Sequence, residues 1–169
     1  MQNPAAEIEK IINDLTTTPS SEVQKQTVFK YFTDNAAYDH PLVHLAPGKN
    51  SRDNLLNFYR VYHTFTYVHK IEVNSIDFNK ENNHLVIDLW ETASPKFFLP
   101  YTIKMRLIVV LNLDKRGELY FISKQEDYFP LQDIAQIIPF GGLFVRTLKA
   151  FNSFVGQAVG TSLHYAGLV

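Results

Sequence analysis

Residues 101–129, YTIKMRLIVVLNLDKRGELYFISKQEDYF, decide the fold class of this 169-residue chain. The odd-numbered positions from Tyr101 to Leu111 are all apolar, whereas the positions between them begin polar and become apolar at Ile108. This alternation predicts a strand with one face on a core. The Asp114-Lys115-Arg116-Gly117 sequence is typical of a tight turn, so we expect a hairpin leading into a last strand over residues 118–129.

Two more strands are predicted before this hairpin. Residues 67–78 alternate, the asparagine-rich residues 79–83 form a turn, and residues 84–92 return as the next strand. The returning strand divides its side chains between two faces, with Leu85, Ile87 and Leu89 on one and Val86, Asp88 and Trp90 on the other.

The N-terminal part has a different periodicity. Residues 3–15, 18–32 and 51–65 each repeat apolar side chains at helical spacing. Residues 36–46 lie between the second and third helices and are extended, with Pro41 restricting them to a sheet edge or a turn. Helices followed by a meander of strands predict an α+β fold, in which three N-terminal helices pack over a curved antiparallel sheet.

Composition excludes several classes of function. A formal net charge of -1 argues against broad nucleic-acid binding, which needs a clustered basic surface. The absence of cysteine removes disulfides, thiolate metal sites and thiol nucleophiles. His40 and His44 lie in an extended segment and need not converge on one metal ion, so we expect no metal site. We expect no cofactor either. The first residues lack a basic stretch followed by an apolar one, so no signal peptide is expected and the chain is predicted on the cytoplasmic side.

Two segments then resemble a known family. The first is residues 31–45, YFTDNAAYDHPLVHL. It is similar to the segment of the nuclear-transport-factor-two-like (SnoaL-like) superfamily in which the second helix ends and an edge strand begins. ISKQEDYFPLQDI at residues 122–134 is similar to the acidic end of its last strand. The resemblance covers about residues 3–135, and the chain looks most like fungal SigF-like members with an apolar tail. It implies a cone-shaped sheet with a pocket under the helices, but the superfamily hosts isomerases, dehydratases, carriers and adaptors, so it does not imply one activity.

The resemblance also suggests acid–base residues. Scytalone dehydratase and ketosteroid isomerase of this superfamily use Asp, His and Tyr side chains that face the pocket, and Asp39, His63 and Asp127 are of these types. A carboxylate in an apolar pocket has a raised pKa and can act as a general base. Each residue has another interpretation: Asp39 as a turn or cap partner, His63 as a hydrogen-bonded histidine, and Asp127 as an ion-pair partner of Arg106 or Lys104.

A larger set of side chains is expected to line the pocket. These residues lie on the edge strand, on the third helix, or on strand positions that we expect to face inward. The predicted ligand-binding residues are Tyr38, Tyr59, Tyr62, His63, Trp90, Tyr101, Met105, Phe121 and Gln125.

Two apolar segments lie outside the predicted core. Phe97, Phe98 and Leu99 stand between two prolines, and adjacent residues of a hairpin tip cannot all turn to one face. They are expected to cover the pocket mouth, contact a partner or membrane, or fold back on the domain.

The C-terminal residues 139–169 form the second segment, separate from a cone domain over residues 1–138. After Asp133 there is no acidic residue, and residues 141–159 make an amphipathic helix that suits a lipid surface better than a membrane span. The predicted membrane-contacting residues of the helix are Phe144, Leu148, Phe151 and Val155. The alternatives are packing on the cone and contact with a partner.

Two functions follow from these patterns. The favoured one is non-enzymatic binding of an apolar ligand, such as a lipid or sterol, with peripheral attachment to the endoplasmic reticulum or to lipid droplets. The alternative is a cofactor-independent dehydratase or isomerase acting on a cyclic carbonyl compound. A homodimer is a further possibility, and nucleic acid is not an expected partner.

Overall fold

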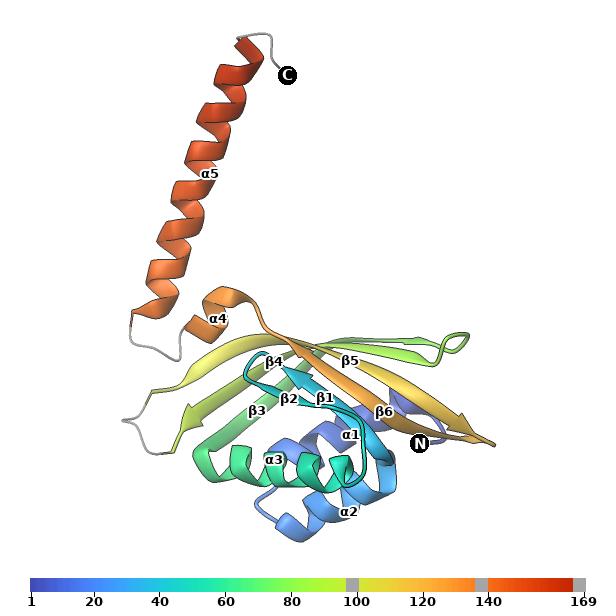
Figure 1. Ribbon diagram of the computed structural model, residues 1–169. Helices are drawn as coiled ribbons and strands as arrows, with labels where there is room; N and C mark the ends of the chain where they lie inside the picture. Colours follow the sequence, from blue (N-terminus) through green and yellow to red (C-terminus); the bar gives the residue numbers. More distant parts are fainter. Residues whose placement is uncertain (97–100, 136–139, 166–169) are drawn as a thin grey trace. The chain divides into compact units, whose positions relative to one another are not determined.

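The computed structural model describes the chain except for residues 97–100, 136–139 and 166–169 (Figure 1). The predicted contact residues Phe97, Phe98 and Leu99 therefore lie outside the described residues. Internal contacts divide the chain into two compact units, Met1–Phe129 and Pro130–Val169. The sequence predicts this boundary slightly later, after residue 138.

The first unit contains three helices and six strands. In chain order they are α1 (Pro4–Thr16), α2 (Ser21–Tyr31), β1 (Phe32–His40), β2 (Val43–Leu45), α3 (Ser51–Phe65), β3 (Thr66–Asn79), β4 (His84–Pro95), β5 (Ile103–Arg116) and β6 (Leu119–Tyr128). The predicted order of elements and the α+β class are confirmed. Helix α1 begins where its capping residues predict. The Asn3 side chain accepts a hydrogen bond from the Ala6 amide, and Pro4 occupies the first turn.

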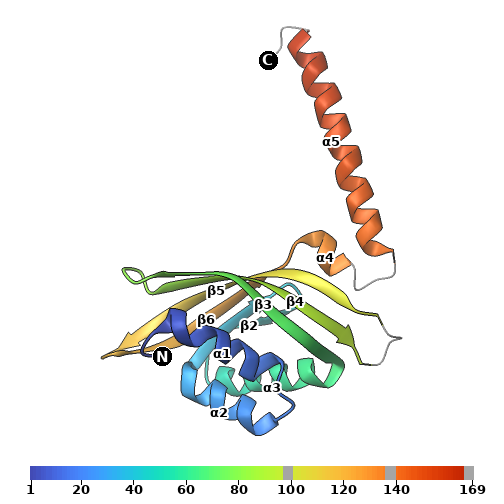
Figure 2. The ribbon, with the colours of Figure 1, turned by 180° about the vertical axis from the view of Figure 1, so that it is seen from behind.

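The strands form one curved sheet in the order β2-β1-β6-β5-β4-β3. Every pair is antiparallel except β1 and β6, which run parallel. The three helices cover one face of the sheet, as seen from both sides in Figures 1 and 2. This covered face is called the inner face below, and the opposite face is called the outer face.

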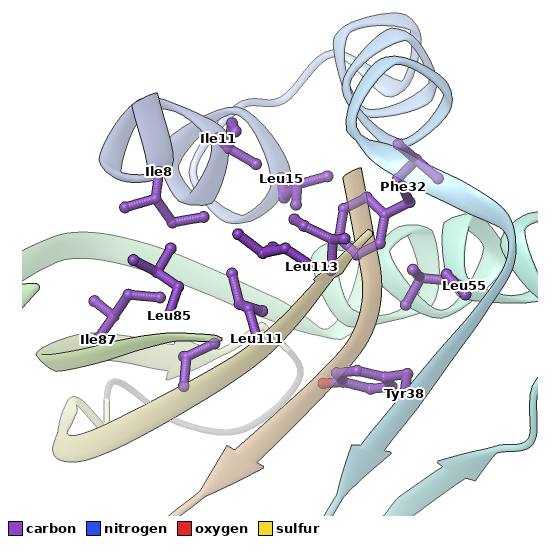
Figure 3. Close-up of a cluster of buried hydrophobic side chains, with 14 of the residues drawn as sticks. Ile8, Ile11, Leu15, Phe32, Tyr38, Leu55, Leu85, Ile87, Leu111 and Leu113 are labelled. Atoms are coloured by element: carbon purple, nitrogen blue, oxygen red, sulfur yellow. The ribbon is translucent and has the colours of Figure 1, made fainter. Parts of the chain in front are cut away.

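The core lies between the helices and the inner face. Ile8, Ile11 and Leu15 of α1 are buried against the strand side chains, and Leu85 and Ile87 are fully buried on β4 (Figure 3). The odd-numbered residues of β4 thus point inward, as the alternation predicted. Their burial is the main source of stability for this unit.

Strand β6 departs from simple alternation. The register against β5 shifts between Asn112 and Leu113, so Ser123 is an extra residue on β6. Tyr120 and Ile122 are buried before the bulge, whereas Gln125 and Asp127 are buried after it. A bulge reverses which positions face inward.

The second unit contains α4 (Leu131–Ala135) and α5 (Gly141–Tyr165). Lys149 donates a hydrogen bond to the Gln132 side chain, and Val145 is buried, so the two helices pack on each other. A C-terminal amphipathic helix was predicted, and α5 extends beyond the expected residues 141–159. In the part of the chain that the structure describes, no helix is long and apolar enough to span a membrane.

Candidate functional site

Six polar side chains meet in the interior between α3 and the inner face of the sheet. We call this set the inner polar cluster: Tyr38, Tyr59, Tyr62, Glu91, Gln125 and Asp127. Most of its members are more than nine-tenths buried, although the face around them is apolar. Buried polar groups of this kind are costly unless they are hydrogen-bonded.

Asp127 is the centre of the larger part of the cluster. The Tyr38 hydroxyl donates to Asp127 Oδ2 at 2.7 Å, and Gln125 Nε2 donates to Asp127 Oδ1 at 3.0 Å. Gln125 Oε1 in turn accepts a hydrogen bond from the Tyr59 hydroxyl at 2.9 Å. Each carboxylate oxygen of Asp127 therefore has one donor.

Glu91 forms the smaller part of the cluster. Its Oε1 atom accepts a hydrogen bond from the Tyr62 hydroxyl at 2.5 Å, and only 5% of the residue is exposed. Among the described residues, no hydrogen bond reaches its second oxygen, Oε2. Oε2 is nevertheless not one of the described buried side-chain atoms that lack a partner, which are Thr33 Oγ1, Ser51 Oγ and Arg52 Nε.

Strand register and helix periodicity bring these side chains together. Glu91 lies opposite Met105 on β5, so both side chains occupy the inner face. Asp127 lies opposite Val109, and Tyr38 opposite Gln125.

Tyr59 and Tyr62 are three residues apart on α3 and therefore share the side of the helix that faces the sheet.

Burial changes the acidity of both carboxyl groups. Desolvation raises the pKa of Glu91 to about 7; the Tyr62 hydrogen bond opposes this shift, and the negative charge of Asp127 adds to it. Desolvation also raises the pKa of Asp127 to about 6, against the hydrogen bonds from Gln125 and Tyr38. The pKa of each of the three tyrosines is raised, mainly by burial, so these hydroxyls stay protonated donors.

Five of the predicted ligand-binding residues lie on or beside the cluster: Tyr38, Tyr59, Tyr62, Met105 and Gln125. Asp127, predicted as a catalytic base, is also a member. The alternative ion pair of Asp127 with Arg106 or Lys104 is wrong, because Arg106 pairs with Asp88 and Lys104 with Glu72 on the outer face.

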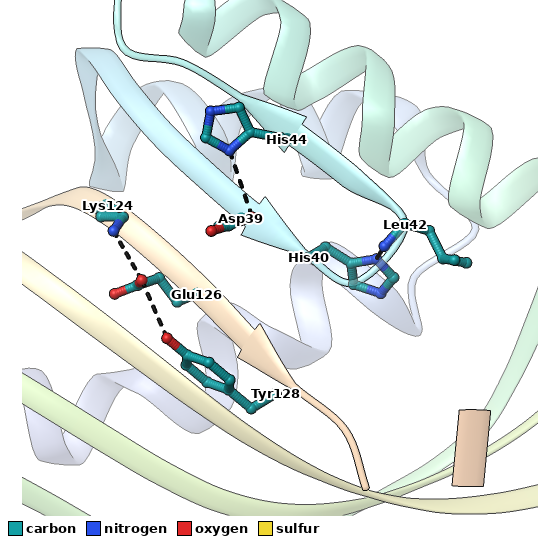
Figure 4. Close-up of polar contacts among 7 residues, drawn as sticks. All are labelled: Asp39, His40, Leu42, His44, Lys124, Glu126 and Tyr128. Atoms are coloured by element: carbon teal, nitrogen blue, oxygen red, sulfur yellow. Dashed lines mark hydrogen bonds and ion pairs between the residues drawn. The ribbon is translucent and has the colours of Figure 1, made fainter. Parts of the chain in front are cut away.

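The structure does not bring Asp39 into the cluster. Its neighbour Tyr38 points inward, so Asp39 points outward, where its side chain is 50% exposed and its Oδ1 lies 3.5 Å from His44 Nδ1 (Figure 4). The outer face of β6 beside it carries a Lys124–Glu126 ion pair. Its partner His44 is the opposite residue on β2, so Asp39 is a cross-strand partner and not the turn or cap partner of the alternative interpretation.

Four other predicted residues lie away from the cluster. Trp90 is on the outer face, where Lys104 Nζ lies 5.4 Å from its ring centroid. Phe121 was expected on the face of Gln125 and Asp127, which is wrong because the bulge at Ser123 reverses the pattern. Tyr101 precedes β5 and is 44% exposed. His63 is half-buried at the end of α3, and burial followed by the nearby Lys96 charge lowers its pKa.

Glu91 is not among the site residues predicted from the sequence. The alternation of Leu85, Ile87 and Leu89 points to residue 91 as the next inward position, and this signal identifies a charged residue on a buried face. The predicted strand over residues 84–92 includes Glu91, but only Leu85, Ile87 and Leu89 were assigned to this face.

The second unit holds the other predicted site. Phe144, Leu148, Phe151 and Val155 are 68%, 45%, 61% and 38% exposed, and nothing in the described part of their own unit covers them. Phe154, which the analysis missed, is 70% exposed and adjoins this stripe on the helix. We call this set the α5 apolar stripe: Phe144, Leu148, Phe151, Phe154 and Val155.

A metal centre has no support among the described residues, which contain no group of three metal-ligating side chains. A shallow groove of about 330 Å³ opens at the N-terminus of α3, lined by Asp34, Lys49, Arg52 and Asp53 among others. Its charges cancel, and Arg52 is already paired with Asp34, so this groove is a weak candidate for an ion site.

Comparisons with known proteins agree with the fold. The family profile of the SigF NTF2-like domain matches residues 1–168. The structure is similar to an LEH-like epoxide hydrolase from M. tuberculosis, with a TM-score of 0.58 and 13% identity over 85% of this chain and 94% of that one. No curated protein matches the chain.

Two further solved structures show the same fold. A protein described as a putative isomerase from Rhodopseudomonas palustris has a TM-score of 0.59 and 9% identity over 79% of this chain and 93% of that one. A hypothetical protein with a ketosteroid isomerase-like fold from Catenulispora acidiphila, solved in complex with trimethylamine, has a TM-score of 0.55 and 14% identity over 75% of this chain and 89% of that one. Likeness at this level of identity shows the fold, and the fold is shared by ligand-binding proteins and by isomerase-like enzymes.

Proposed function

Because the chain belongs to the SigF NTF2-like family, we propose that it binds a small, largely apolar molecule at the inner face of its sheet, beside the inner polar cluster. The observation that carries this proposal is a pair of buried carboxyl groups, each hydrogen-bonded to a tyrosine, on an otherwise apolar face. A lipid or sterol-like molecule that carries one or two oxygen atoms has the matching chemistry.

Stability alone does not account for the cluster. Replacing buried charged or polar groups by well-packed apolar ones is often neutral or stabilising. Buried groups with strongly shifted pKa values are found preferentially at functional sites. Similar solved structures include an epoxide hydrolase and a complex with trimethylamine, so this fold is able to hold small organic molecules.

Met105 supports the location of the ligand. It lies beside Glu91 on the inner face and is only half-buried, although Leu107, Val109 and Leu111 further along the same face are buried. The inner face next to the carboxyl group is therefore partly accessible to solvent at Met105. We expect the ligand to bind there.

Native mass spectrometry of protein purified without detergent tests the proposal. We expect a mass above that of the 19.5 kDa chain, with an organic molecule released on denaturation. Met105→Trp fills the inner space and is expected to remove the added mass. Lys104→Trp places the same ring on the outer face and is expected to keep it.

Equal retention of the added mass in both variants would contradict the proposed location. A wild-type chain that carries no organic molecule, and takes up none when incubated with a lipid extract, would contradict the binding function. The same spectra distinguish a monomer from a homodimer.

A second candidate, a dehydratase or isomerase acting on a cyclic carbonyl compound, is favoured by the acidity of the cluster. Glu91 and Asp127 have pKa values of about 7 and about 6, so one can be protonated while the other is ionised near neutral pH. General acid–base catalysis needs such a pair.

The test of this second candidate is the isomerisation of 3-cyclohexen-1-one to its conjugated enone, which is measured by the absorbance of the enone. We expect a bell-shaped pH–rate profile that Asp127→Asn abolishes, whereas Asp39→Asn, on the outer face, leaves it unchanged.

The α5 apolar stripe suggests peripheral attachment to a lipid surface, such as that of the endoplasmic reticulum or a lipid droplet. Half-burying its four or five large side chains contributes on the order of 5 kcal/mol, which gives weak and reversible binding. Arg146 and Lys149 lie off the stripe, and no acidic residue follows Asp133.

Flotation with phosphatidylcholine vesicles tests the attachment. Phe144→Asp, Leu148→Asp and Phe151→Asp together are expected to abolish flotation. Asn152→Asp, Ser153→Asp and Gln157→Asp add the same charge off the stripe and are expected to preserve most of it. Equal flotation of the two triple variants would contradict attachment through the stripe.

A further inference from the structure

The side of α5 opposite the α5 apolar stripe carries the two fixed charges of the helix. At about 100° per residue, Arg146 and Lys149 each project about 150° from the middle of the stripe. Val145, four residues before Lys149 and so on the same side, is buried, and Lys149 donates a hydrogen bond to Gln132 of α4. Helix α4 therefore packs on the charged side of α5, and the cations face away from the stripe.

The residues that border the stripe are polar but uncharged. Thr147 and Thr161 lie along one border, and Asn152 lies along the other. The Thr147 hydroxyl donates to the Leu143 carbonyl at 2.9 Å, so this group is satisfied within the helix. The borders are where lipid headgroups meet a helix that lies in a membrane surface. At these positions α5 presents no positive charge to the headgroups.

The second half of α5 depends on its apolar face for stability. Every residue from Phe151 to Ser162 is exposed. Gly156 and Gly160 lie in this half, and a side-chain carbon at either would meet no described atom within 4 Å. Glycine weakens an exposed helix, and most helices in proteins are stabilised by burial of an amphipathic face. A surface that buries the stripe therefore also stabilises this half of the helix.

A second copy of the helix is a poor match for the stripe. Leu148, Phe151 and Val155 are spaced as in a coiled-coil seam, but Phe154 and Val159 widen the apolar face on both sides of it. Coiled-coil helices pair through opposite charges beside the seam. The two fixed charges of α5 are both positive and lie on the far side, so two copies have no such ion pair to form. Acyl chains accept a wide apolar face without matching charges.

Charge also distinguishes between lipid surfaces. Helices that bind anionic lipids carry Lys and Arg on a polar face next to the headgroups. In α5 the cations lie on the far side of a helix roughly 10 Å wide, and salt screens charges over about the same distance. Lys149 is also held by Gln132. Apolar contact therefore has to supply most of the binding.

Resting on the lipid attachment proposed above, we infer that the α5 apolar stripe selects a neutral lipid surface whose headgroups are loosely packed. The rings of Phe144, Phe151 and Phe154 need gaps between headgroups to reach the acyl chains. Where the gaps are missing, no electrostatic attraction compensates for the lost contact. The partner is thus defined by exposed acyl chains rather than by headgroup charge.

Flotation of the full chain with three kinds of vesicle tests the inference. Dioleoyl-phosphatidylcholine packs loosely, palmitoyl-oleoyl-phosphatidylcholine with cholesterol packs tightly, and the third kind adds phosphatidylserine to the tightly packed mixture. We expect binding to the first to be about tenfold stronger than to the second, the effect of fully inserting about one more phenylalanine ring. Phosphatidylserine is expected to change the binding by less than about twofold.

Two double variants test the position of the charge. Asn152→Lys with Thr161→Lys places two cations along the borders of the stripe, and we expect about tenfold stronger binding to the phosphatidylserine vesicles. Ser153→Lys with Gln157→Lys adds the same charge on the far side, and we expect a gain of less than about twofold. All four positions are exposed, so neither variant disturbs a core. Equal gains in the two variants would overturn the inference.

The outcomes separate this inference from the proposed attachment. Equal binding to loosely and tightly packed neutral vesicles contradicts only the inference, as does wild-type binding that needs phosphatidylserine and is lost at high salt. Absence of flotation with every kind of vesicle contradicts the attachment as well. A dimer that Phe151→Asp dissociates, in a chain that does not float, would instead make the stripe an interface between two copies.

Discussion

Glu91 and Asp88 lie three residues apart on the same strand, yet their acidities have moved in opposite directions. Asp88 is on the outer face, where Arg106 donates two hydrogen bonds to it at 2.9 and 2.7 Å and holds its pKa below the ordinary value. Glu91 is on the inner face, where burial raises its pKa to about 7. The side of the strand, rather than the residue type, decides the chemistry of each carboxyl group.

The difference extends over the neighbouring strands. On the outer face, Glu72 pairs with Lys70 and Lys104, so the carboxylates there have basic partners. Within the described inner polar cluster, the carboxyl groups have only tyrosine and amide donors. The outer face is therefore arranged to keep carboxylates ionised, and the inner face to make their protonation easy.

The largest effect expected from a single substitution tests whether the inner face carries the stability of the fold. Leu89→Ala removes a side chain with no exposed surface and is expected to lower the free energy of unfolding by about 2–5 kcal/mol. Val86→Ala, on the half-buried outer face of the same strand, is expected to cost about 1 kcal/mol or less. Chemical denaturation of both variants measures the difference, and similar losses would contradict the assignment of the two faces.

The next effect concerns stability against pH. The pKa of Glu91 is raised on folding, so between pH 4.5 and about 7 the folded state binds more protons than the unfolded state, and stability falls as the pH rises. Asp127 adds the same trend between pH 3.8 and about 6. The loss is on the order of 3 kcal/mol for each group.

Denaturation of the Glu91→Gln, Asp127→Asn double variant checks this trend. Its stability is expected to change much less than that of the wild type between pH 4 and pH 8. An equally steep decline in the double variant would show that other groups cause it.

The smallest effect is expected on the outer face. Asp88→Asn removes one partner of Arg106, but half of that arginine is exposed, so the pair is screened by solvent and salt. Because the pKa of Asp88 is lowered on folding, its contribution is present above the unfolded pKa and is lost as the pH falls. Melting temperatures at low and high salt measure it, and a shift as large as that of Leu89→Ala would break the comparison.

Much of this arrangement follows from the sequence. Alternation from Leu85 to Leu89 predicted the inner side of β4, and Gly117, with a φ of 60°, occupies the turn that the residues from Asp114 predicted. The family resemblance on residues 31–45 and 122–134 predicted the fold, which is confirmed over nearly the whole chain.

The failures have local physical causes. One extra residue at Ser123 changes which side of β6 faces inward, and nothing in the alternation from Phe121 to Asp127 indicates it. Asp39 and Trp90 were chosen by residue type, although each lies next to an inward residue, Tyr38 and Glu91 respectively, and so points outward. Glu91 was missed because the inward alternation was followed only from Leu85 to Leu89.

The most direct test of the account is a carboxyl titration by carbon-13 NMR of protein labelled at its glutamate side chains. We predict one glutamate carboxyl that titrates near pH 7 and is absent in Glu91→Gln, while the outer-face Glu72 titrates below its ordinary value. If the Glu91 carboxyl titrates near 4.5 with the ordinary glutamates, the inner face does not favour the protonated form, and the account is contradicted.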